Sequence, residues 1–383
     1  MPQGVPGSSL ISAYPLKSGI GTYSRRLFEL GFHEELVMFK IVGSYSEEGF
    51  DAVIKHPVPI GGLAAFLSMY VGSRWSEYVS RRSLVHFTSP DWFHMAKYAK
   101  TSYGTVHDVC PVDHPEWFSR RYVLYFRKEM EAARRLNRLI AVSRTTSRAV
   151  REHFPDLDPV VIHNWTGPEF RPRDRNAARE ALGLPLDKRI VLSVGSDIPR
   201  KNFPTVLRMM EFLPDDYVLV RLGSFAFRGS GASARSMGAL AARGRVRIVQ
   251  DAPRDSIPLY YNAADVLVAP SLEEGFDLPV IEAMNSGIPV IASDIEVHRE
   301  VMMGLGRYVD PAADPSEWAE EVRRVVEDDG AGDRNPWSGI GDYYREERAA
   351  REYAKLYGLD RAPGGRRTPA GGSAPRMRSA RPT

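Results

Sequence analysis

The sequence contains a single cysteine, Cys110, among 383 residues. One thiol excludes an internal disulfide framework and a zinc site built from cysteines, and it is typical of a protein from a reducing compartment. The longest apolar run, residues 60–72, has thirteen residues, whereas a membrane-spanning helix needs about 20. The first residues lack the charged and apolar segments of a secretory signal. We therefore expect a cytoplasmic protein.

Most of the chain also lacks an excess of charge of either sign. The whole sequence has 51 basic and 48 acidic residues, a formal net charge of +3. Residues 361–383 contain six arginines and no acid, so the first 360 residues carry 45 basic and 48 acidic side chains, a net charge of −3. This near-neutral body argues against nucleic acid as a partner. The basic tail 361–383, rich in Gly and Pro with little to bury, is predicted to be disordered.

The composition, with 43% hydrophobic and 26% charged residues, is that of a globular protein long enough for two domains. Short apolar runs alternate with helix-like stretches in both halves of the chain. Continuous apolar strands are typical of parallel sheets covered on both faces, so the alternation predicts two doubly wound α/β domains. The predicted strands are 8–14, 36–42, 83–89, 103–109, 138–143, 159–164, 189–195, 217–223, 245–250, 265–270 and 289–293.

The pattern is interrupted at residues 163–175, where Gly, Pro and charged residues gather before a helix predicted over about 176–182. The predicted domains are therefore 1–168 and 169–340, both Rossmann-like, and a ligand is expected in the cleft between them, beyond the carboxyl ends of the strands. Residues 341–360 contain a predicted terminal amphipathic helix, which is expected to pack back towards the first domain.

The most informative segment is PSLEEGFDLPVIEAMNSGIPVIASD, residues 270–294. A buried strand ends at Pro270, and a helix is predicted to begin near Leu278, with Asp277 as a plausible N-cap. Gly287 is suited to end that helix in the C′ position. The helix start directs free N–H groups and a positive dipole end into the cleft, which suits a phosphate.

Two carboxylates accompany this helix start. Glu274 lies in the loop and Glu282 about one turn into the helix, so the pair can contact hydroxyl groups on either side of an anchored diphosphate. Taken singly, each has an ordinary alternative: Glu282 as a complement to the helix dipole, and Glu274 as a solvated loop acid.

A second segment, VLSVGSDIPRKNFPTVL at 191–207, has a strand that ends at Gly195 and then Arg200, Lys201 and Asn202 directly before a helix. Two fixed cations beside a dianionic leaving group stabilise the charge that grows as a glycosidic bond breaks. The alternative is a basic pair on the surface.

The first half offers weaker signals. His107 is predicted at the carboxyl end of a strand, where neutral imidazole can accept from a hydroxyl, although a lone His is more often structural. Asp108 could orient its ring, and His114 is a local rival. Gly19 and Gly21 stand before a helix, where glycine permits close approach of a ligand or simply forms a turn.

These segments resemble the Glu-x7-Glu motif and accompanying loops of the retaining, family-four glycosyltransferases of GT-B fold, over about residues 10–357. The resemblance implies that Glu274 meets the transferred sugar, that Glu282 holds the ribose hydroxyls, and that the amides after Glu274 approach sugar and phosphate. It also implies a diphosphate on the basic pair and His107 facing the scissile bond. The implied catalytic residues are His107, Arg200, Lys201 and Glu274, and the implied donor-binding residues are Gly19, Gly21, Gly195, Asn202, Gly275, Phe276, Asp277, Leu278 and Glu282.

Two departures from the family pattern stand out. Asp277 replaces the usual Gly, and we expect it to cap the helix. Ser18 replaces the first Gly of the Gly-Gly-x-Gly loop that the family has before its first helix.

The resemblance predicts a transferase with an acceptor-side first domain and a nucleotide-sugar-binding second domain. It would move a sugar, of mannosyl or glucosyl type, from a nucleotide-diphosphate sugar to an acceptor hydroxyl with retention of configuration. The acceptor would be a glycan, a lipid-linked molecule or a small molecule. Alternatives are a sugar-nucleotide epimerase or hydrolase on the same fold, and a non-catalytic nucleotide-sugar binder that acts through its tail.

Two further segments could indicate a metal site and a membrane contact. Asp156 and Asp158 match the Asp-x-Asp of metal-dependent glycosyltransferases, but Pro flanks them, so we interpret them as a turn and expect no required metal or other cofactor. Residues 60–72 are predicted to be a buried helix; the alternative is peripheral contact with the cytoplasmic face of a membrane, together with Arg74, Arg81 and Arg82.

Overall fold

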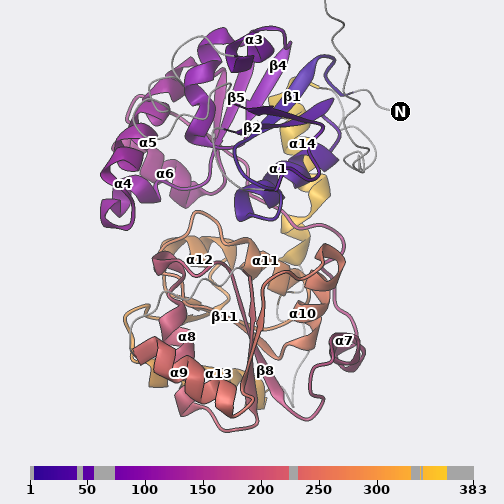
Figure 1. Cartoon of the computed structure of the whole chain (residues 1–383), viewed down its shortest axis with the longest axis vertical. Coiled ribbons are helices and arrows are strands. Elements are labelled where there is room, and N and C mark those ends of the chain that lie inside the picture. The colour runs from indigo at the N-terminus through magenta and orange to yellow at the C-terminus, as the bar shows by residue number, and fades with distance from the viewer. Residues whose placement is uncertain are drawn as a thin grey trace, which may run out of the picture.

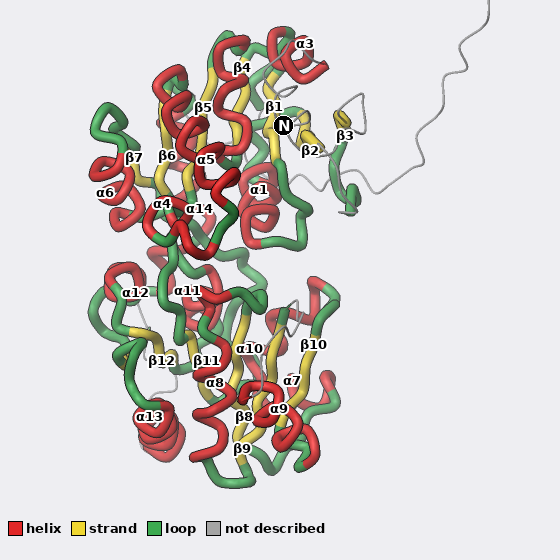
Figure 2. The backbone as a smooth tube through the Cα atoms, turned by 60° about the vertical axis from the view of Figure 1, so that its left-hand side comes forward, coloured by secondary structure: helices red, strands yellow, loops and turns green. Residues whose placement is uncertain are grey.

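The computed structural model describes residues 4–40, 46–55, 74–223, 232–328, 337 and 340–359. The chain forms two lobes stacked along its long axis (Figure 1). Each lobe is a parallel sheet with helices on both sides of the strands (Figure 2). The predicted pair of doubly wound α/β units is confirmed. The apolar segment 60–72 and the tail 361–383 lie outside the described residues.

The first sheet has the strand order β3-β2-β1-β4-β5-β6-β7, and every pairing in it is parallel. Its strands are β1 (Ser8–Ser12), β2 (Glu35–Lys40), β3 (Ala52–Lys55), β4 (Leu84–Phe87), β5 (Ser102–Val106), β6 (Arg138–Ala141) and β7 (Val160–Val161). Its helices are α1 (Gly19–Glu29), α3 (Arg74–Ser80), α4 (Cys110–Asp113), α5 (Arg120–Ala132) and α6 (Arg144–His153), with 3₁₀ turns η1 (Pro90–Tyr98), η2 (Pro115–Trp117) and η3 (Ala133–Arg135).

The second sheet has the order β10-β9-β8-β11-β12-β13, again with parallel pairings. Its strands are β8 (Arg189–Val194), β9 (Tyr217–Leu222), β10 (Val246–Val249), β11 (Val266–Ala269), β12 (Val290–Ser293) and β13 (Arg307–Val309). The α-helices of this half are α7 (Arg175–Leu182), α8 (Phe203–Met209), α9 (Ala232–Ala242), α10 (Ile257–Ala263), α11 (Leu278–Asn285), α12 (Glu296–Val301), α13 (Pro315–Asp328) and α14 (Glu346–Leu356). The 3₁₀ turns are η4 (Pro199–Lys201), η5 (Met210–Phe212), η6 (Arg254–Ser256) and η7 (Gly341–Tyr344).

All eleven predicted strands are present, although β7 is reduced to two residues. Strands β3 and β13 were not predicted from the sequence. Both lie at the edge of a sheet, and each contains an exposed residue. With four and three residues, one of them exposed in each case, neither is long enough to form the continuous apolar run that marks a central strand.

In each sheet the chain order reverses once, between β1 and β4 in the first and between β8 and β11 in the second. Such a switch point separates the loops that follow the two strands and opens a ligand site between them. The loop before α1 follows β1, and the segments 191–207 and 270–294 contain the loops that follow β8 and β11. The topology therefore directs the predicted motifs to the carboxyl ends of the sheets.

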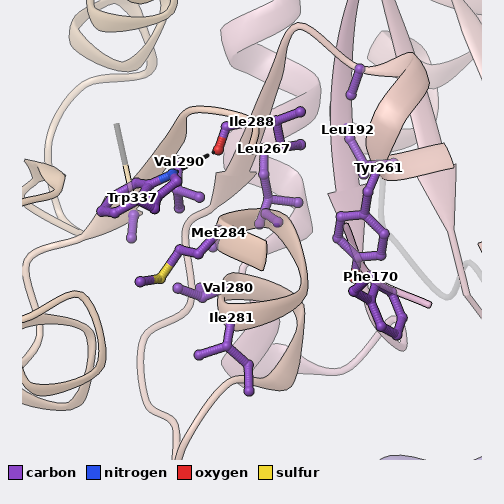
Figure 3. Close-up of a cluster of buried hydrophobic side chains, with 14 of the residues drawn as sticks. Phe170, Leu192, Tyr261, Leu267, Val280, Ile281, Met284, Ile288, Val290 and Trp337 are labelled. Carbon is purple, nitrogen blue, oxygen red and sulfur yellow. Dashed lines mark hydrogen bonds between the residues drawn. The ribbon is translucent and has the colours of Figure 1, made fainter. Parts of the chain in front are cut away.

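A buried apolar cluster holds α10 and α11 against one face of the second sheet (Figure 3). Met284 of α11 is 1% exposed and Val290 of β12 is 1% exposed. Trp337 joins this cluster, and its indole Nε1 donates a hydrogen bond to the carbonyl of Ile288 at 2.9 Å. This packing makes α11 a rigid support for the residues at its start.

Helix α14, drawn in yellow, returns to the first lobe (Figure 1). The hydroxyl of Tyr353 lies 2.7 Å from that of Tyr23 on α1, and Tyr357 lies 2.6 Å from Nδ1 of His86 on β4. The chain passes between the lobes twice, near Thr166 and near Tyr344. These two connecting segments are in contact, because the amide of Thr166 donates a hydrogen bond to the carbonyl of Tyr344 at 2.9 Å. None of the helices in the described ranges combines the length and apolar character needed to cross a membrane.

Candidate active site

The loops after β5 and β11 meet where the two lobes face each other. A Cβ added to Gly275 would overlap the carbonyl oxygen of His107. The hydroxyl of Thr146, at the start of α6, lies 3.1 Å from that carbonyl and 3.2 Å from the carbonyl of Gly275. Glycine is therefore required at position 275 by the close approach of the two lobes.

The predicted cations converge on this contact. One terminal nitrogen of Arg200 lies 3.3 Å from Glu274 and 3.4 Å from Asp108 of the first lobe. The Lys201 ammonium lies 2.6 Å from Glu274 and 2.9 Å from Asp277. Two cations and three carboxylates thus share one cluster, and Glu274, 7% exposed, is not a solvated loop acid.

The charges in this cluster set each other's protonation. Glu274 is the largest influence on Arg200 and raises the pKa of its guanidinium against the effect of burial. Burial would lower the pKa of Lys201, but Asp277 and Glu274 together raise it above the ordinary value. Both side chains therefore remain cationic at neutral pH.

Backbone geometry fixes the basic pair in place. Gly195 has φ 137°, and a Cβ there would stand 3.3 Å from Cε of Lys201. Asn202 follows η4 in the left-handed region with φ 47°, and its Oδ1 accepts from Thr205 at 2.9 Å. The turn between β8 and α8 consequently directs Lys201 towards the loop after β11, which carries Glu274 and Asp277.

Asp277 occupies the N-cap position of α11 but does not cap it, which corrects the sequence-based expectation. Its backbone is left-handed (φ 66°) and its side chain accepts no hydrogen bond from the helix. The carboxylate instead faces Lys201 and, at 3.2 Å, the buried His298. Although burial favours the neutral acid, Lys201 and His298 lower the pKa of Asp277. The first amides of α11 therefore receive no side-chain cap from Asp277.

The other amide-bearing residues of this loop have separate structural roles. The ring of Phe276 is 3% exposed and belongs to the apolar cluster beneath α11. Leu278 is the first residue of that helix, and Gly287, with φ 77°, ends it as predicted. The ring of Phe276 is thus used in packing, so its backbone is what this residue can offer to a ligand at the helix start.

Glu282 is 8% exposed and lies inside the interface of the lobes. One carboxylate oxygen pairs with Arg26 of α1 at 2.7 Å, and the other accepts from the hydroxyl of Tyr261 at 2.7 Å. A mere complement to the helix dipole would not need either partner. Burial, together with the charge of Glu282, raises the pKa of Tyr261, so the hydroxyl keeps the proton that it donates to Glu282.

His107 lies at the end of β5 and its Nε2 is 2.8 Å from the carbonyl of Thr88. Burial lowers the pKa of the imidazole, so the ring is neutral at pH 7 and Nε2 carries the proton that it donates to that carbonyl. Tyr23 meets the ring edge-on at 4.8 Å. Asp108, which could have oriented His107, instead accepts from the amide of Cys110 and pairs with Arg200.

The rival His114 is also at the boundary of the lobes. Its Nε2 lies 3.0 Å from Glu273, and its ring stacks on Trp117 with centroids 4.0 Å apart. Burial, together with the negative charge of Asp108, raises the pKa of Glu273 to about 7. His114 thus contacts a different carboxylate from the one that meets Arg200 and Lys201.

The glycines before α1 have different surroundings. A Cβ at Gly21 would overlap the carbonyl of Pro15, so this glycine is required by the chain's own loop. Gly19 has open space around it. Ser18 caps the helix by accepting from the amide of Gly21 at 3.0 Å, which accounts for serine where the family has glycine.

Sequence reasoning missed Glu300 of α12. Its carboxylate accepts from the amides of Arg144 and Thr145 at the start of α6, at 2.7 and 2.9 Å, and lies 2.7 Å from His163. Burial would raise its pKa, but these hydrogen bonds lower it to about 2. No local motif signals this contact, because its partners lie more than 130 residues away. Arg26 was missed for the same reason.

The Asp-x-Asp segment forms a turn, as interpreted from the sequence. Asp156 pairs with Arg134 and Asp158 with Arg151. Across the described ranges, no group of three or more His, Cys, Asp or Glu side chains has a geometry that could hold a metal ion.

The second half of the chain is similar to a known protein family. Residues 174–339 match the family model "Glycosyl transferases group 1". The O-antigen chain mannosyltransferase RfbU of Salmonella typhimurium is 25% identical over 81% of this chain and 88% of its own length. The D-inositol 3-phosphate glycosyltransferase of Mycolicibacterium vanbaalenii is 35% identical, but over 42% of this chain and 39% of that relative.

Solved structures share the fold over nearly the whole chain. HepE from Anabaena, crystallised with UDP and glucose, superposes with a TM-score of 0.73 over 92% of this chain and 99% of its own, at 16% identity. WaaG, a glycosyltransferase involved in lipopolysaccharide biosynthesis, superposes with a TM-score of 0.65 over 92% and 100%, also at 16% identity. Residues 174–339 thus match a group 1 glycosyltransferase domain, and the chain as a whole shares the two-lobed fold of HepE and WaaG.

Proposed function

We propose that the cluster around Arg200, Lys201 and Glu274 is the catalytic centre of this transferase. Arg200 and Lys201 hold the donor diphosphate, and Glu274 orients the transferred sugar. The observation that carries the proposal is that both cations lie within 3.3 Å of Glu274, beside a helix start that Asp277 does not cap.

The chemistry follows from that arrangement. The bond between the anomeric carbon and the phosphate oxygen breaks while a bond forms from the acceptor oxygen on the same face of the sugar. The departing phosphate oxygen takes the acceptor's proton. Negative charge grows on the diphosphate, and the two fixed cations and the amides of α11 stabilise it. Because carboxylates already hold Arg200 and Lys201 in place, little reorganisation is needed.

The remaining roles follow the same geometry. The neutral His107 donates through Nε2 to Thr88, so Nδ1 is left as an acceptor for a hydroxyl of the donor sugar. Glu282 binds the ribose hydroxyls. Gly19, next to open space, lies along the diphosphate, and the backbone groups of 275–278 contact sugar and phosphate. The acceptor hydroxyl approaches from the first lobe.

We further propose a hexose donor of mannosyl or glucosyl type and a glycan acceptor, ahead of a lipid-linked or small-molecule acceptor. An O-antigen chain mannosyltransferase among the relatives and UDP with glucose in a structural neighbour support this choice. Two side-chain cations supply the charge that a metal would otherwise provide, so no metal or other cofactor is required.

We propose a cytoplasmic location, and peripheral membrane contact near Arg74, Arg81 and Arg82 is the alternative. Glu77 already pairs with Arg81, and Glu35 with Arg82. These pairs reduce the charge that would face anionic headgroups, and thus disfavour strong membrane binding through these residues.

The transferase assignment also replaces the alternatives of an epimerase, a hydrolase or a non-catalytic binder. In a hydrolase, Glu274 and Glu282 would have to act together as acid and nucleophile. They instead contact different cations, on β8's loop and on α1.

The experiment is a thermal-shift panel of UDP-, GDP- and ADP-linked glucose and mannose on the full chain, followed by mass spectrometry of products formed with oligosaccharide, lipid-linked and small-molecule acceptors. Nuclear magnetic resonance of the product reports retention of configuration, and parallel reactions contain EDTA. We expect one donor to raise the melting temperature and transfer to be unaffected by EDTA. Loss of transfer with EDTA would contradict the metal-independent mechanism. Strong hydrolysis of the donor with no acceptor product would contradict the proposed acceptor chemistry.

A further inference from the structure

Arg26 of α1 contacts the second lobe through a buried ion pair. Its side chain is 5% exposed, and one terminal nitrogen lies 2.7 Å from Glu282 of α11. The other terminal nitrogen donates to the carbonyl of Trp165 at 2.9 Å. Trp165 directly precedes Thr166, where the two segments that connect the lobes are in contact. The guanidinium of Arg26, in the first lobe, therefore contacts both the connecting segment and the second lobe.

Glu282 depends on this contact for its orientation. One of its oxygens faces Arg26 and the other accepts from Tyr261 of α10, at 2.7 Å in each case. An ionised carboxylate offers about four lone-pair sites, so two remain for hydroxyl groups of a ligand. A donor from each lobe thus fixes the plane of the carboxylate without using its whole capacity.

We propose that Arg26 is a positioning residue for the nucleotide ribose. It holds Glu282 in the orientation that accepts from the ribose hydroxyls, and it makes nucleotide binding sensitive to the approach of the two lobes. This inference rests on the proposed role of Glu282. The alternative is that the ion pair only joins the lobes and has no bearing on ribose recognition.

The two readings differ in what the loss of Arg26 does to ligands with and without ribose hydroxyls. A positioning residue affects binding only when the hydroxyls are present. A residue that only joins the lobes affects both ligands equally. The probes are UDP, GDP and ADP and their 2′,3′-dideoxy forms, and the nucleotide that the unmodified chain binds most tightly is carried forward.

The variants are Arg26→Met, Arg26→Lys and Glu282→Gln, and the double variant Arg26→Met/Glu282→Gln. Removing Arg26 alone leaves a buried carboxylate without its cation, which can destabilise the fold severely. The double variant removes both charges and avoids this problem. Arg254→Met is the matched control, because Arg254 of the second lobe also pairs with α1, through Glu29 at 3.1 Å, but at an exposed position.

Calorimetry measures each dissociation constant, and thermal unfolding confirms that each variant is folded. In the unmodified chain we expect the dideoxy nucleotide to bind about tenfold more weakly than the ribonucleotide, equivalent to about 1.4 kcal/mol. Arg26→Met, Glu282→Gln and the double variant should each weaken the ribonucleotide about tenfold and the dideoxy form less than twofold. Arg26→Lys should retain part of the preference, and Arg254→Met all of it.

Two results would overturn different parts of the argument. If the unmodified chain prefers the ribonucleotide and Glu282→Gln abolishes the preference, while the Arg26 variants keep it, Arg26 has no positioning role. If the unmodified chain has no preference, or binds none of the three nucleotides, the proposed role of Glu282 itself is wrong.

Discussion

Gly275 of the second lobe lies directly against the backbone of His107 in the first, so closely that a Cβ at position 275 would overlap the His107 carbonyl oxygen. Both residues belong to the loops that carry the proposed catalytic centre. The packing of the two lobes and the geometry of the reaction are therefore decided at the same contact.

Gly275→Ala tests that contact. The added methyl group must push the two loops apart, and a displacement of about 1 Å at a reacting centre can cost about 100-fold in rate. We expect kcat/KM to fall by about that factor while the protein remains folded. The control is Gly238→Ala on α9, where a Cβ meets nothing within 4 Å and alanine favours the helix by about 0.5–1 kcal/mol. Equal activity of the two variants would show that the contact is unimportant.

Arg200→Ala removes one cation from the proposed diphosphate site. Loss of one such electrostatic contact costs roughly 2–4 kcal/mol of transition-state stabilisation, or about 30- to 1000-fold in turnover. Initial rates should show that fall in kcat, with a smaller change in KM. Arg299→Ala, which removes an exposed arginine paired with Asp294, should retain full activity. A fall confined to KM would place Arg200 in ground-state binding instead.

Glu300→Gln tests the carboxylate at the start of α6. The folded pKa of about 2 lies below the ordinary 4.5, so the stabilisation is complete above about pH 4.5 and is lost as the pH falls towards 2. Urea unfolding should show the variant less stable than the parent at pH 7, with the difference shrinking below pH 4. Glu296→Gln, on the same helix but exposed, should cost at most about 1 kcal/mol. A difference that is constant with pH would contradict the assignment.

Glu273→Gln has the opposite pH dependence. Burial raises the pKa of this carboxyl from 4.5 to about 7, so the folded state loses stability as the pH rises from about 4.5 to 7 and stays penalised above that. The variant should be more stable than the parent at pH 8 and equal to it at pH 4, by thermal unfolding. The control is Glu116→Gln, whose carboxylate also pairs with His114 but is exposed. Lower stability of Glu273→Gln at pH 8 would show that the pair with His114 outweighs burial.

Two truncations test separately the basic tail, residues 361–383, and the helix α14 that precedes it. Removal of 361–383 should leave turnover unchanged, because the proposed centre uses no residue of the tail. Removal from residue 346 onwards deletes α14 and with it the contacts of Tyr353 and Tyr357 with the first lobe. Loss of one buried aromatic side chain costs about 3–5 kcal/mol, so this variant should be strongly destabilised. Loss of turnover on removal of 361–383 alone would contradict the prediction that the tail has no part in catalysis.

Local pattern was sufficient for much of the fold. Central strands such as β8 and β11 are buried on both faces and therefore appear as uninterrupted apolar runs. The start of α11 was recognisable from Leu278 and Pro279, and its end from Gly287. The strands β3 and β13 carry no such signal, since they have only four and three residues and one residue of each is exposed.

In the candidate site, too, some residues could be identified from local sequence and others could not. Arg200, Lys201 and Glu274 were identified because their loops follow buried strands, and parallel strands bring such loops to one edge of the sheet. Asp277 was misjudged, since its preference for the cap was outweighed by Lys201 and His298. Nothing within a few residues of Asp277 indicates that these two charges are its neighbours.

Chain order, composition and short-range periodicity were enough to establish two α/β lobes and the segments that carry the chemistry, because strands, helices and turns depend on neighbours close in sequence. The contact of Glu282 with Arg26, the partners of Glu300, and the need for glycine at position 275 depended on the packing of the lobes against each other. Those contacts join residues more than 130 positions apart, and they exist only once burial and charge have brought both halves of the chain together.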